Sequence, residues 1–459
     1  MAFFEFFGVA VVGVLLLNGG SVFIFGFGVC YLLVLMEFFV RPLIGCQFGE
    51  LVLMDSLSVL LVVMSLLVGV MSLMCSTKDF NVSSLLVKKG IEVPVILVLG
   101  FSIGAFISSS WLGFFVCFEG SLLPMLWMIL VWGYQPERLQ AGVYMVLYTV
   151  CGSLPLLVSL LWLGSVVSSD VFLVAKMSCW FCWQTAGLSL WMVFGLMAGF
   201  MVKFPLYLVH GWLPKAHVEA PLAGSMILSG VLLKLGSFGL YRVMWLVNLK
   251  GGEFYGKVFV YLVVVVGLLG GCLCNLYCLC QSDLKSMVAY SSVGHMGLCL
   301  CGLLSGVSLG HAGAACMMFS HGLCSPILFA LAAALHDWSD SRSILLNKGL
   351  NSLFPVFSLF WAVAWFVNMG IPLSLNFMAE WMLISSLGSI SCWLLPFGWL
   401  SCFLSGAAAF YAYGAVCHGV VSDFNRPFGV GISSRYFYGG SFGLVFLLLG
   451  SLGLDFFVC

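Results

Sequence analysis

Charged side chains are scarce in this sequence. Of its 459 residues only 7% are charged and 63% are apolar, whereas roughly a quarter of the residues are charged in an ordinary soluble domain. This composition excludes a water-soluble globule and predicts a membrane protein. The 17 basic and 17 acidic residues cancel, so we expect no general attraction to nucleic acid or to an acidic membrane surface.

Motifs for nucleotides and iron–sulfur clusters are missing as well. The sequence has no G-x-x-x-x-G-K-[ST], no G-x-G-x-x-G after a strand, and no cysteine spacing typical of an iron–sulfur cluster. We therefore expect the chain to bind no nucleotide or redox cofactor of its own. No Arg-rich leader precedes the first apolar run, which carries Glu5, so we expect that run to remain as a membrane span.

Cysteine, by contrast, is abundant, with 19 residues. Cys179 and Cys182 form a C-x-x-C pair, and four more cysteines lie between Cys272 and Cys280. A pair with this spacing is expected by chance at such a frequency, and the four clustered cysteines do not share one face of a helix. We interpret them as small buried apolar residues and expect no metal site.

Apolar stretches long enough to cross a bilayer follow one another along the whole sequence. A hydrocarbon core about 30 Å thick requires about 20 apolar residues of helix. We therefore predict an all-α polytopic membrane protein with about fourteen spans. They lie near residues 3–18, 21–39, 52–75, 92–110, 112–132, 140–163, 189–209, 221–245, 256–280, 284–305, 309–335, 354–388, 391–417 and 436–457.

Basic residues are unevenly divided between the two sides of the predicted membrane. Of the 17, ten lie in loops that follow odd-numbered spans, five lie in loops that follow even-numbered spans, and Lys203 and Lys234 lie inside spans. Loops rich in Lys and Arg stay on the inner side. This predicts that both termini face the outer side.

Four charged residues lie well inside predicted spans: Glu119, Lys203, Lys234 and Glu380. Each costs about 2.5–3.5 kcal/mol on insertion scales, so all four must be paired, hydrated or neutral. Two acids and two bases can pair with one another, and opposing effects of pairing and burial allow such groups to exchange protons cheaply. Structural ion pairs between helices are the simpler alternative.

Histidines 295 and 321 also lie inside predicted spans. A single membrane histidine is as often a core side chain that hydrogen-bonds to a neighbouring helix. Two of them together with four charges favour a proton relay, because imidazole both accepts and donates a proton near neutral pH.

Two spans are interrupted beside an ionisable residue. Pro205 has no N–H and clashes with the preceding turn, so it should end a helix next to Lys203 and free the carbonyl of Met201. The segment Asn368–Ser374, with its glycine and proline, interrupts a second span shortly before Glu380. Non-helical backbone survives at this depth only where protein or a watery cavity satisfies it. Ordinary proline kinks are the alternative.

The interrupted spans are the seventh and the twelfth, and an odd offset makes two five-span units enter the membrane in opposite senses. Paired broken helices in such inverted repeats mark the ion path of transporters. We predict four parts: residues 1–91 with spans 1 to 3, residues 92–245 and 256–417 as the two inverted repeats, and residues 418–459 with the last span.

Five segments resemble a known family, the antiporter-like membrane subunits of NADH:ubiquinone oxidoreductase (respiratory complex I), and its chain 4 members in particular. The resemblance runs from about residue 100 to 415 and is most specific in KFPLYLVHGWLPKAHVEAPLAGSMILSGVLLKLGSFGLYR. The segments are residues 133–157, 203–242, 282–298, 321–332 and 370–381.

The resemblance implies a proton-translocating subunit of the mitochondrial inner membrane with an antiporter-like fold. It also implies sister antiporter-like chains, other membrane-arm subunits and lipids as partners, and NADH and ubiquinone as substrates of the whole complex rather than ligands of this chain. Lys215, Lys285, His210 and His217 are weaker candidates for the site. By this resemblance Glu119 and Lys203 are the acid and base pair of the first half-channel, and Lys234 is the central lysine. His295 and His321 are the connecting histidines, and Glu380 is the exit acid.

Two other functions fit the same motifs. The chain could be the membrane subunit of a multi-subunit sodium/proton antiporter, which shares this pattern. It could also be a passive spacer of the membrane arm, in which the intramembrane charges only hold helices together.

Overall fold

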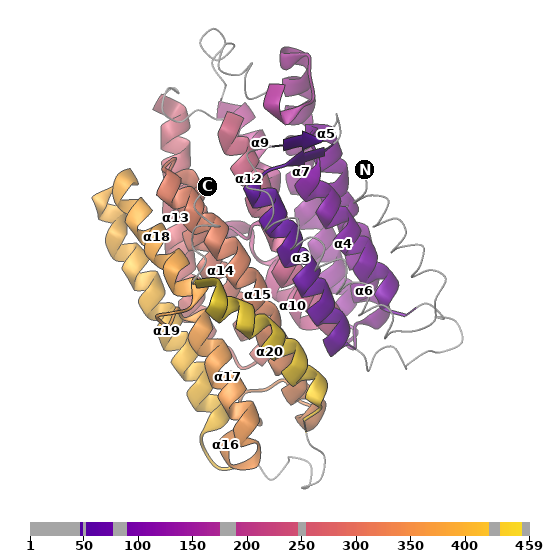
Figure 1. The fold of residues 1–459 in the computed structure, drawn as a ribbon, viewed down its shortest axis with the longest axis vertical. Helices are drawn as coiled ribbons and strands as arrows, with labels where there is room; N and C mark the ends of the chain where they lie inside the picture. The colour runs from indigo at the N-terminus through magenta and orange to yellow at the C-terminus, as the bar shows by residue number, and fades with distance from the viewer. Residues whose placement is uncertain are drawn as a thin grey trace.

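The computed structural model is a bundle of long helices that run roughly side by side (Figure 1). Predicted spans 1 and 2, and the pair Cys179 and Cys182, lie outside the residues that it describes. Residues 52–54, predicted as the start of a span, instead form strand β2, because the helix begins only after the N-cap Asp55. The described residues are 46–48, 52–76, 90–174, 190–246, 254–421 and 432–451.

Eight helical segments of the described ranges are long and apolar enough to cross a membrane, and three shorter apolar helices accompany them. The elements are β1 Cys46–Phe48, β2 Val52–Met54, α3 Ser56–Cys75, α4 Glu92–Ile107, α5 Trp111–Gly120, α6 Leu122–Trp132, α7 Arg138–Val167, α9 Leu190–Lys203, η1 Tyr207–Val209, α10 Trp212–Glu219, α11 Leu222–Ile227, η2 Leu228–Leu232, α12 Leu233–Leu246, α13 Phe254–Cys280, α14 Leu284–Leu304, α15 Ser308–Ser339, α16 Leu350–Leu353, α17 Pro355–Asn368, α18 Leu375–Ile390, η3 Cys392–Leu394, α19 Leu395–Cys417 and α20 Ser434–Leu449.

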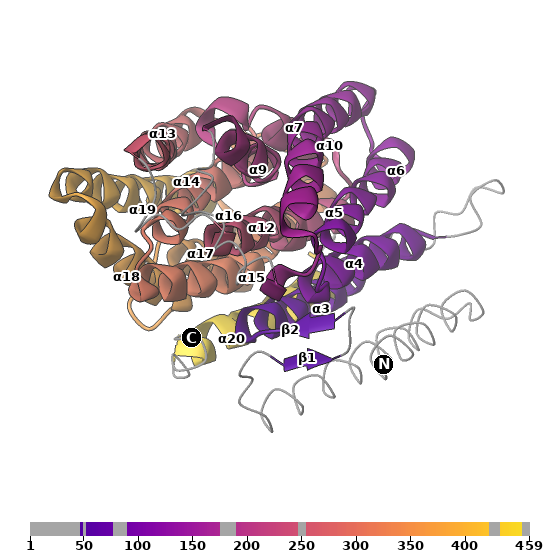
Figure 2. The ribbon, with the colours of Figure 1, turned by 90° about the horizontal axis from the view of Figure 1, so that it is seen from above.

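The bundle has a buried axis and an apolar rim. The most apolar stretch of α15 is entirely buried, and this helix contacts α3, α14, α17, α18 and α20. Viewed from above, α15 and α12 lie in the middle, whereas α6 and α7 lie at one end of the molecule and α18 and α19 at the other (Figure 2). On α7 a row of aliphatic side chains from Leu147 to Leu161 is exposed. Such a rim suits lipid or neighbouring chains, so the polar site must lie along the axis.

Both predicted interruptions are present. α9 ends at Lys203, and a short 3₁₀ turn separates it from α10. The carbonyl that we expected to be freed, that of Met201, accepts a hydrogen bond from the N–H of Leu206 at 3.2 Å. The next carbonyl, Val202, accepts one from the indole of Trp212 at 3.0 Å. The broken backbone therefore keeps its partners inside the protein.

The second interruption is satisfied in the same way. Between α17 and α18, Gly370 and Leu373 have φ values of +78°. Asn376 donates its side-chain amide to the carbonyl of Val367 at 3.0 Å, and the hydroxyl of Ser374 caps α18 by accepting from Phe377. Each break thus uses a side chain from the following helix. The division at residues 92–245 and 256–417 stays a prediction.

Helices α13 and α14 touch backbone to backbone through glycines. A Cβ atom placed on Gly297 would lie 2.6 Å from the carbonyl oxygen of Gly267, and one on Gly271 would lie 3.2 Å from that of Gly294. Small residues at such crossings permit close van der Waals packing, which replaces the hydrophobic effect as the force between helices in lipid.

We expect Gly297→Ala to destabilise the protein by about 1–3 kcal/mol, because its methyl group meets a backbone oxygen that no change of rotamer can move. The midpoint of thermal inactivation in detergent measures this change. Gly414→Ala on α19 is the matched control, since nothing lies within 4 Å of the added Cβ and alanine favours a helix. Equal midpoints for the two variants would contradict this close packing.

Candidate functional site

The six ionisable residues predicted for the site lie inside the bundle on six different helices. Five of them are buried, and the exception is the Glu119 side chain, which is 23% exposed. The structure gathers them into two groups. Glu119 lies on α5, Lys203 at the end of α9, Lys234 on α12, His295 on α14, His321 on α15 and Glu380 on α18.

The first group is an ion pair at the first interruption. The Nζ atom of Lys203 lies 3.6 Å from Oε1 of Glu119 and 3.3 Å from the centre of the Phe118 ring. It also donates a hydrogen bond to the carbonyl of Phe118. A carboxylate, a carbonyl and an aromatic face therefore surround the ammonium group. Because α9 ends at this residue, its side chain reaches α5 without a further turn of helix in the way.

The second group begins at Lys234, which is fully buried. Its Nζ atom lies 2.9 Å from Nδ1 of His321 and donates to the carbonyl of Ser229 at 2.7 Å. Ser229 belongs to η2, a π-helical turn that lies just before Lys234 in the chain. Such turns leave i−4 carbonyls without their usual helical donor. Among the described residues no carboxylate lies within ion-pair distance of Lys234, and its partners are the Ser229 carbonyl and the His321 ring.

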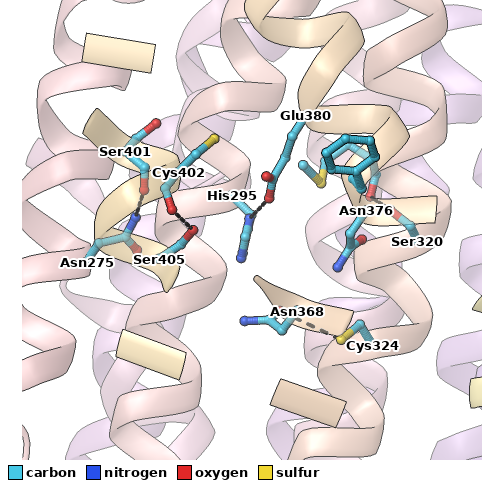
Figure 3. Close-up of polar contacts among 12 residues, drawn as sticks. Asn275, His295, Ser320, Cys324, Asn368, Asn376, Glu380, Ser401, Cys402 and Ser405 are labelled. Carbon is cyan, nitrogen blue, oxygen red and sulfur yellow. Dashed lines mark hydrogen bonds and ion pairs between the residues drawn. The ribbon is translucent and has the colours of Figure 1, made fainter. Parts of the chain in front are cut away.

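The same group continues from His321 to Glu380. The rings of His321 and His295 have centroids 5.7 Å apart, and Nδ1 of His295 lies 3.5 Å from Oε1 of Glu380 (Figure 3). A Cβ on Gly370 would lie 2.9 Å from Oε2 of Glu380. The carboxylate therefore packs directly against the second interruption, where glycine supplies both the space and the positive φ.

Polar residues that the sequence did not single out surround Glu380. The hydroxyl of Ser405 donates to the carbonyl of Cys402 at 2.8 Å. The amide of the buried Asn275 donates to the carbonyl of Ser401 at 3.0 Å. These residues belong to α13 and α19, and they lie beside His295 and Glu380 in Figure 3. Only an asparagine inside a long apolar run could have signalled this environment from the sequence.

No hydrogen bond or ion pair within the described part of the chain joins the two groups. Lys203 and Lys234 lie on α9 and α12, which pack closely, since a Cβ on Gly236 would lie 2.7 Å from the N atom of Phe204. The structure therefore brings together four predicted residues in one row and two in a pair beside it.

The weaker candidates of the middle motif lie in different surroundings. His210 hydrogen-bonds to the carbonyl of Tyr207 and stacks on its ring. Lys215 lies 3.8 Å from the centre of the Tyr144 ring. The partners of His210 and Lys215 thus lie outside the row.

The chain has extensive similarity to known proteins. The family described as "NADH:quinone oxidoreductase/Mrp antiporter, TM" matches residues 108–405. NADH-ubiquinone oxidoreductase chain 4 of Ceratitis capitata is 42% identical over 75% of this chain and 74% of its own length. The protein of the same name from Lumbricus terrestris is 38% identical over 83% of this chain and 82% of its own.

Two solved structures have the same fold at low sequence identity. A chain of respiratory complex I from Thermus thermophilus with bound NADH matches with a TM-score of 0.83 and 22% identity, over 97% of this chain and 93% of its own length. A chain of the Mrp complex from Dietzia sp. DQ12-45-1b matches with a TM-score of 0.85 and 16% identity, over 100% and 96%. By fold and by sequence, this chain belongs to the NADH-ubiquinone oxidoreductase chain 4 family, within the NADH:quinone oxidoreductase/Mrp antiporter transmembrane family.

Proposed function

We propose that the chain is a proton-translocating core subunit of the membrane arm of NADH:ubiquinone oxidoreductase, in the mitochondrial inner membrane. The observation that carries the proposal is the buried row Lys234, His321, His295 and Glu380, whose neighbouring polar atoms or rings are 2.9, 5.7 and 3.5 Å apart. Groups of this kind inside a membrane mark proton paths. The family membership supports the same function.

In this proposal, the ion pair beside the row controls when Lys203 releases its proton. While Glu119 faces Lys203, its carboxylate favours the charged form of the lysine. When Glu119 turns away, the buried ammonium keeps only a carbonyl and the Phe118 ring, which makes release of its proton favourable. The proton then moves by way of Lys234 and the two histidines to Glu380.

The energy and the partners come from elsewhere in the complex under this proposal. Glu119 is the member of the site nearest the surface, and its neighbours on α5, Leu112 and Val116, are exposed apolar residues. This face suits a sister antiporter-like chain that moves or neutralises Glu119. Under this proposal, oxidation of NADH and reduction of ubiquinone occur on other subunits, so this chain needs no redox centre.

The sodium/proton antiporter remains the alternative with an observation in its favour, the fold shared with the Mrp complex. Sequence favours the first function, because relatives near 40% identity over most of the chain are named NADH-ubiquinone oxidoreductase chain 4. A passive spacer is disfavoured by the row itself, since ion pairs that only join helices do not require two adjacent histidines.

Lys234→Met tests the relay. Removing the amine leaves His321 without a proton donor on its Nδ1 side, so we expect NADH-driven proton transport by the assembled complex in vesicles to fall at least about tenfold. Lys348→Met, in the loop between α15 and α16, is the control and should transport normally. Normal transport by Lys234→Met at normal assembly would end the proposed function.

The pair of Glu119 and Lys203 distinguishes a relay from a spacer. Glu119→Gln leaves a buried ammonium without its acid, so it should lower the thermal midpoint of the complex more than the double variant Glu119→Gln/Lys203→Met does. A relay predicts lost proton transport in both variants. If the double variant recovered both stability and transport, the pair would be only structural.

Sodium dependence separates the two transport functions. A subunit that moves only protons should drive the same rate of vesicle acidification when choline replaces sodium in the medium. Radioactive sodium uptake gives an independent measurement. Sodium transport that follows NADH oxidation and disappears in Glu380→Gln would favour the antiporter instead.

A further inference from the structure

Six aromatic side chains lie between the Glu119–Lys203 pair and one end of the bundle. All six are buried, and none is more than 3% exposed. They come from α5, α9, α12 and the segment that follows α7. We call them the aromatic cluster, which consists of Trp111, Phe114, Phe118, Phe172, Phe200 and Phe238.

The rings of the aromatic cluster touch one another, with Phe114 at the centre. Its ring centroid lies 5.6 Å from that of Phe118, 5.8 Å from Phe200, 6.1 Å from Phe238 and 6.4 Å from Phe172. Aromatic rings at such separations pack closely, and phenyl rings offer water no hydrogen-bond partner of ordinary strength. A Cβ on Gly239 would lie 2.1 Å from the Phe200 ring, so this ring packs directly on the backbone of α12. The interior of the cluster is therefore apolar and filled.

A cation lies over each end of the aromatic cluster. At one end Lys203, a member of the site, lies over the ring of Phe118. At the other end the guanidinium carbon of Arg242 lies 4.9 Å from the centre of the Phe238 ring and 5.5 Å from that of Phe172. The Arg242 side chain is buried as deeply as the rings. The cluster thus separates two buried cations.

Packing alone does not account for Arg242. Its guanidinium forms an ion pair with Asp55, the N-cap residue of α3. Arginine stays charged at any physiological pH, and a buried ion pair often stabilises a protein no more than apolar side chains of similar size do. A permanent positive charge at this place therefore indicates a function that an apolar residue could not supply.

The aromatic cluster lies on the outer side of the site by the charge rule. Trp111, whose ring centroid is 4.3 Å from that of Phe172, lies between the fourth and fifth predicted spans, and Phe172 follows the sixth. Loops after even-numbered spans carry five basic residues against ten in the others, which places them outside. On α12, Arg242 lies about 12 Å beyond Lys234 toward this side. The cluster thus lies between the ion pair at the first interruption and the outer surface.

We propose that the aromatic cluster and Arg242 form a proton barrier, which closes the direct way between Lys203 and the outer side. Apolar constrictions exclude water, and a fixed arginine charge repels protons in membrane pores. Here the rings interrupt any hydrogen-bonded chain of water, and the guanidinium repels a hydronium ion that arrives from outside. A proton on Lys203 therefore passes to the row instead of escaping outward.

The inference rests on the proposed function, because a pump works only if protons cannot return. Pumping raises the electrochemical potential of protons on the outer side, which drives them back toward the site. Glu119 and Lys203 would accept these protons if water reached the pair from that side. The barrier therefore keeps transport in one direction at the first group.

Passive proton permeability tests the barrier without NADH. The purified complex is placed in liposomes with valinomycin and equal potassium on both sides, and a trapped pH-sensitive dye follows the decay of an imposed pH gradient. Phe114→Ser replaces the central ring by a small hydroxyl side chain and lets water enter, so the gradient should decay several-fold faster than with the unaltered complex. Phe114→Leu keeps this place apolar and should stay tight.

Further variants separate a proton path from a loosened structure. Phe357→Ser removes an equally buried ring, which packs against Trp361 and Phe437 outside the aromatic cluster, and it should stay tight. The double variant Phe114→Ser/Lys203→Met should lose most of the added leak, because the amine that accepts the proton is gone. Arg242→Gln should leak, because the barrier loses its fixed charge.

If Phe114→Ser prevents assembly, Phe172→Ser at the outer end of the cluster takes its place with the same expected leak. Tight liposomes for both serine variants, or an equal leak from Phe357→Ser, would overturn the inference. A tight Arg242→Gln would remove Arg242 from the barrier. None of these results depends on NADH-driven transport, so lost transport in Lys234→Met would leave the proposed function standing. Normal transport in Lys234→Met would end the proposed function, whereas a leak in Phe114→Ser would still show the barrier.

Discussion

Hydrocarbon offers no partner to a polar group, and this constraint determines where each unusual residue of the chain lies. A broken helix or a charge survives at membrane depth only if neighbouring protein supplies what water would have supplied. The indole of Trp212 and the amide of Asn376 satisfy carbonyls at the two interruptions. The carbonyls of Phe118 and Ser229 do the same for the two lysine side chains. Side chains therefore satisfy backbone carbonyls at the two interruptions, and backbone carbonyls in turn satisfy the two buried lysines.

At the π-helical turn this exchange explains why an ionisable residue lies beside irregular backbone. A regular helix has no spare carbonyl to offer, whereas Ser229 in this turn offers one to Lys234. Lys203 lies where α9 ends, Lys234 lies two residues after the end of η2, and Glu380 packs against Gly370 between α17 and α18. Irregular backbone thus lies beside each of these three buried ionisable residues.

The sequence was sufficient for the kind of fold, but it did not predict which of the candidate side chains would lie beside one another. Apolar length predicted the spans from residue 92 onward. Four charged residues and two histidines inside those spans were the candidates for the site, and their roles stay a prediction. Which acid faces which base depends on contacts between helices far apart in the chain. Glu380 lies beside His295 rather than a lysine, and Lys234 lies beside His321 rather than an acid. No local pattern indicates such pairings.

The sequence also did not predict the local geometry of the backbone and side chains. The π-helical turn at Leu228–Leu232 contacts α3 and α15. The pair Ser229 and Gly230 weakens a helix at this place, but it does not by itself specify a π turn. The carbonyl of Met201 regains a donor from Leu206, which a proline rule alone does not predict. His217 and His210 are equivalent in the motif, and only burial distinguishes them. One stacks on Phe329 inside the protein, and the other meets Tyr207 near its surface.

The arrangement of acids and bases has a consequence for control. The two lysines occupy the interior, whereas Glu119 lies at the rim on α5 and Glu380 borders α19, near the opposite end of the bundle. A neighbouring chain can therefore reach Glu119 without entering the core, whereas Glu380 is buried. Because buried charges interact through a medium of low dielectric constant, moving one carboxylate alters the proton affinity of the base beside it. Lys234 and His321 share a hydrogen bond. A change in the proton affinity of one of them therefore alters that of the other without a large motion of helices.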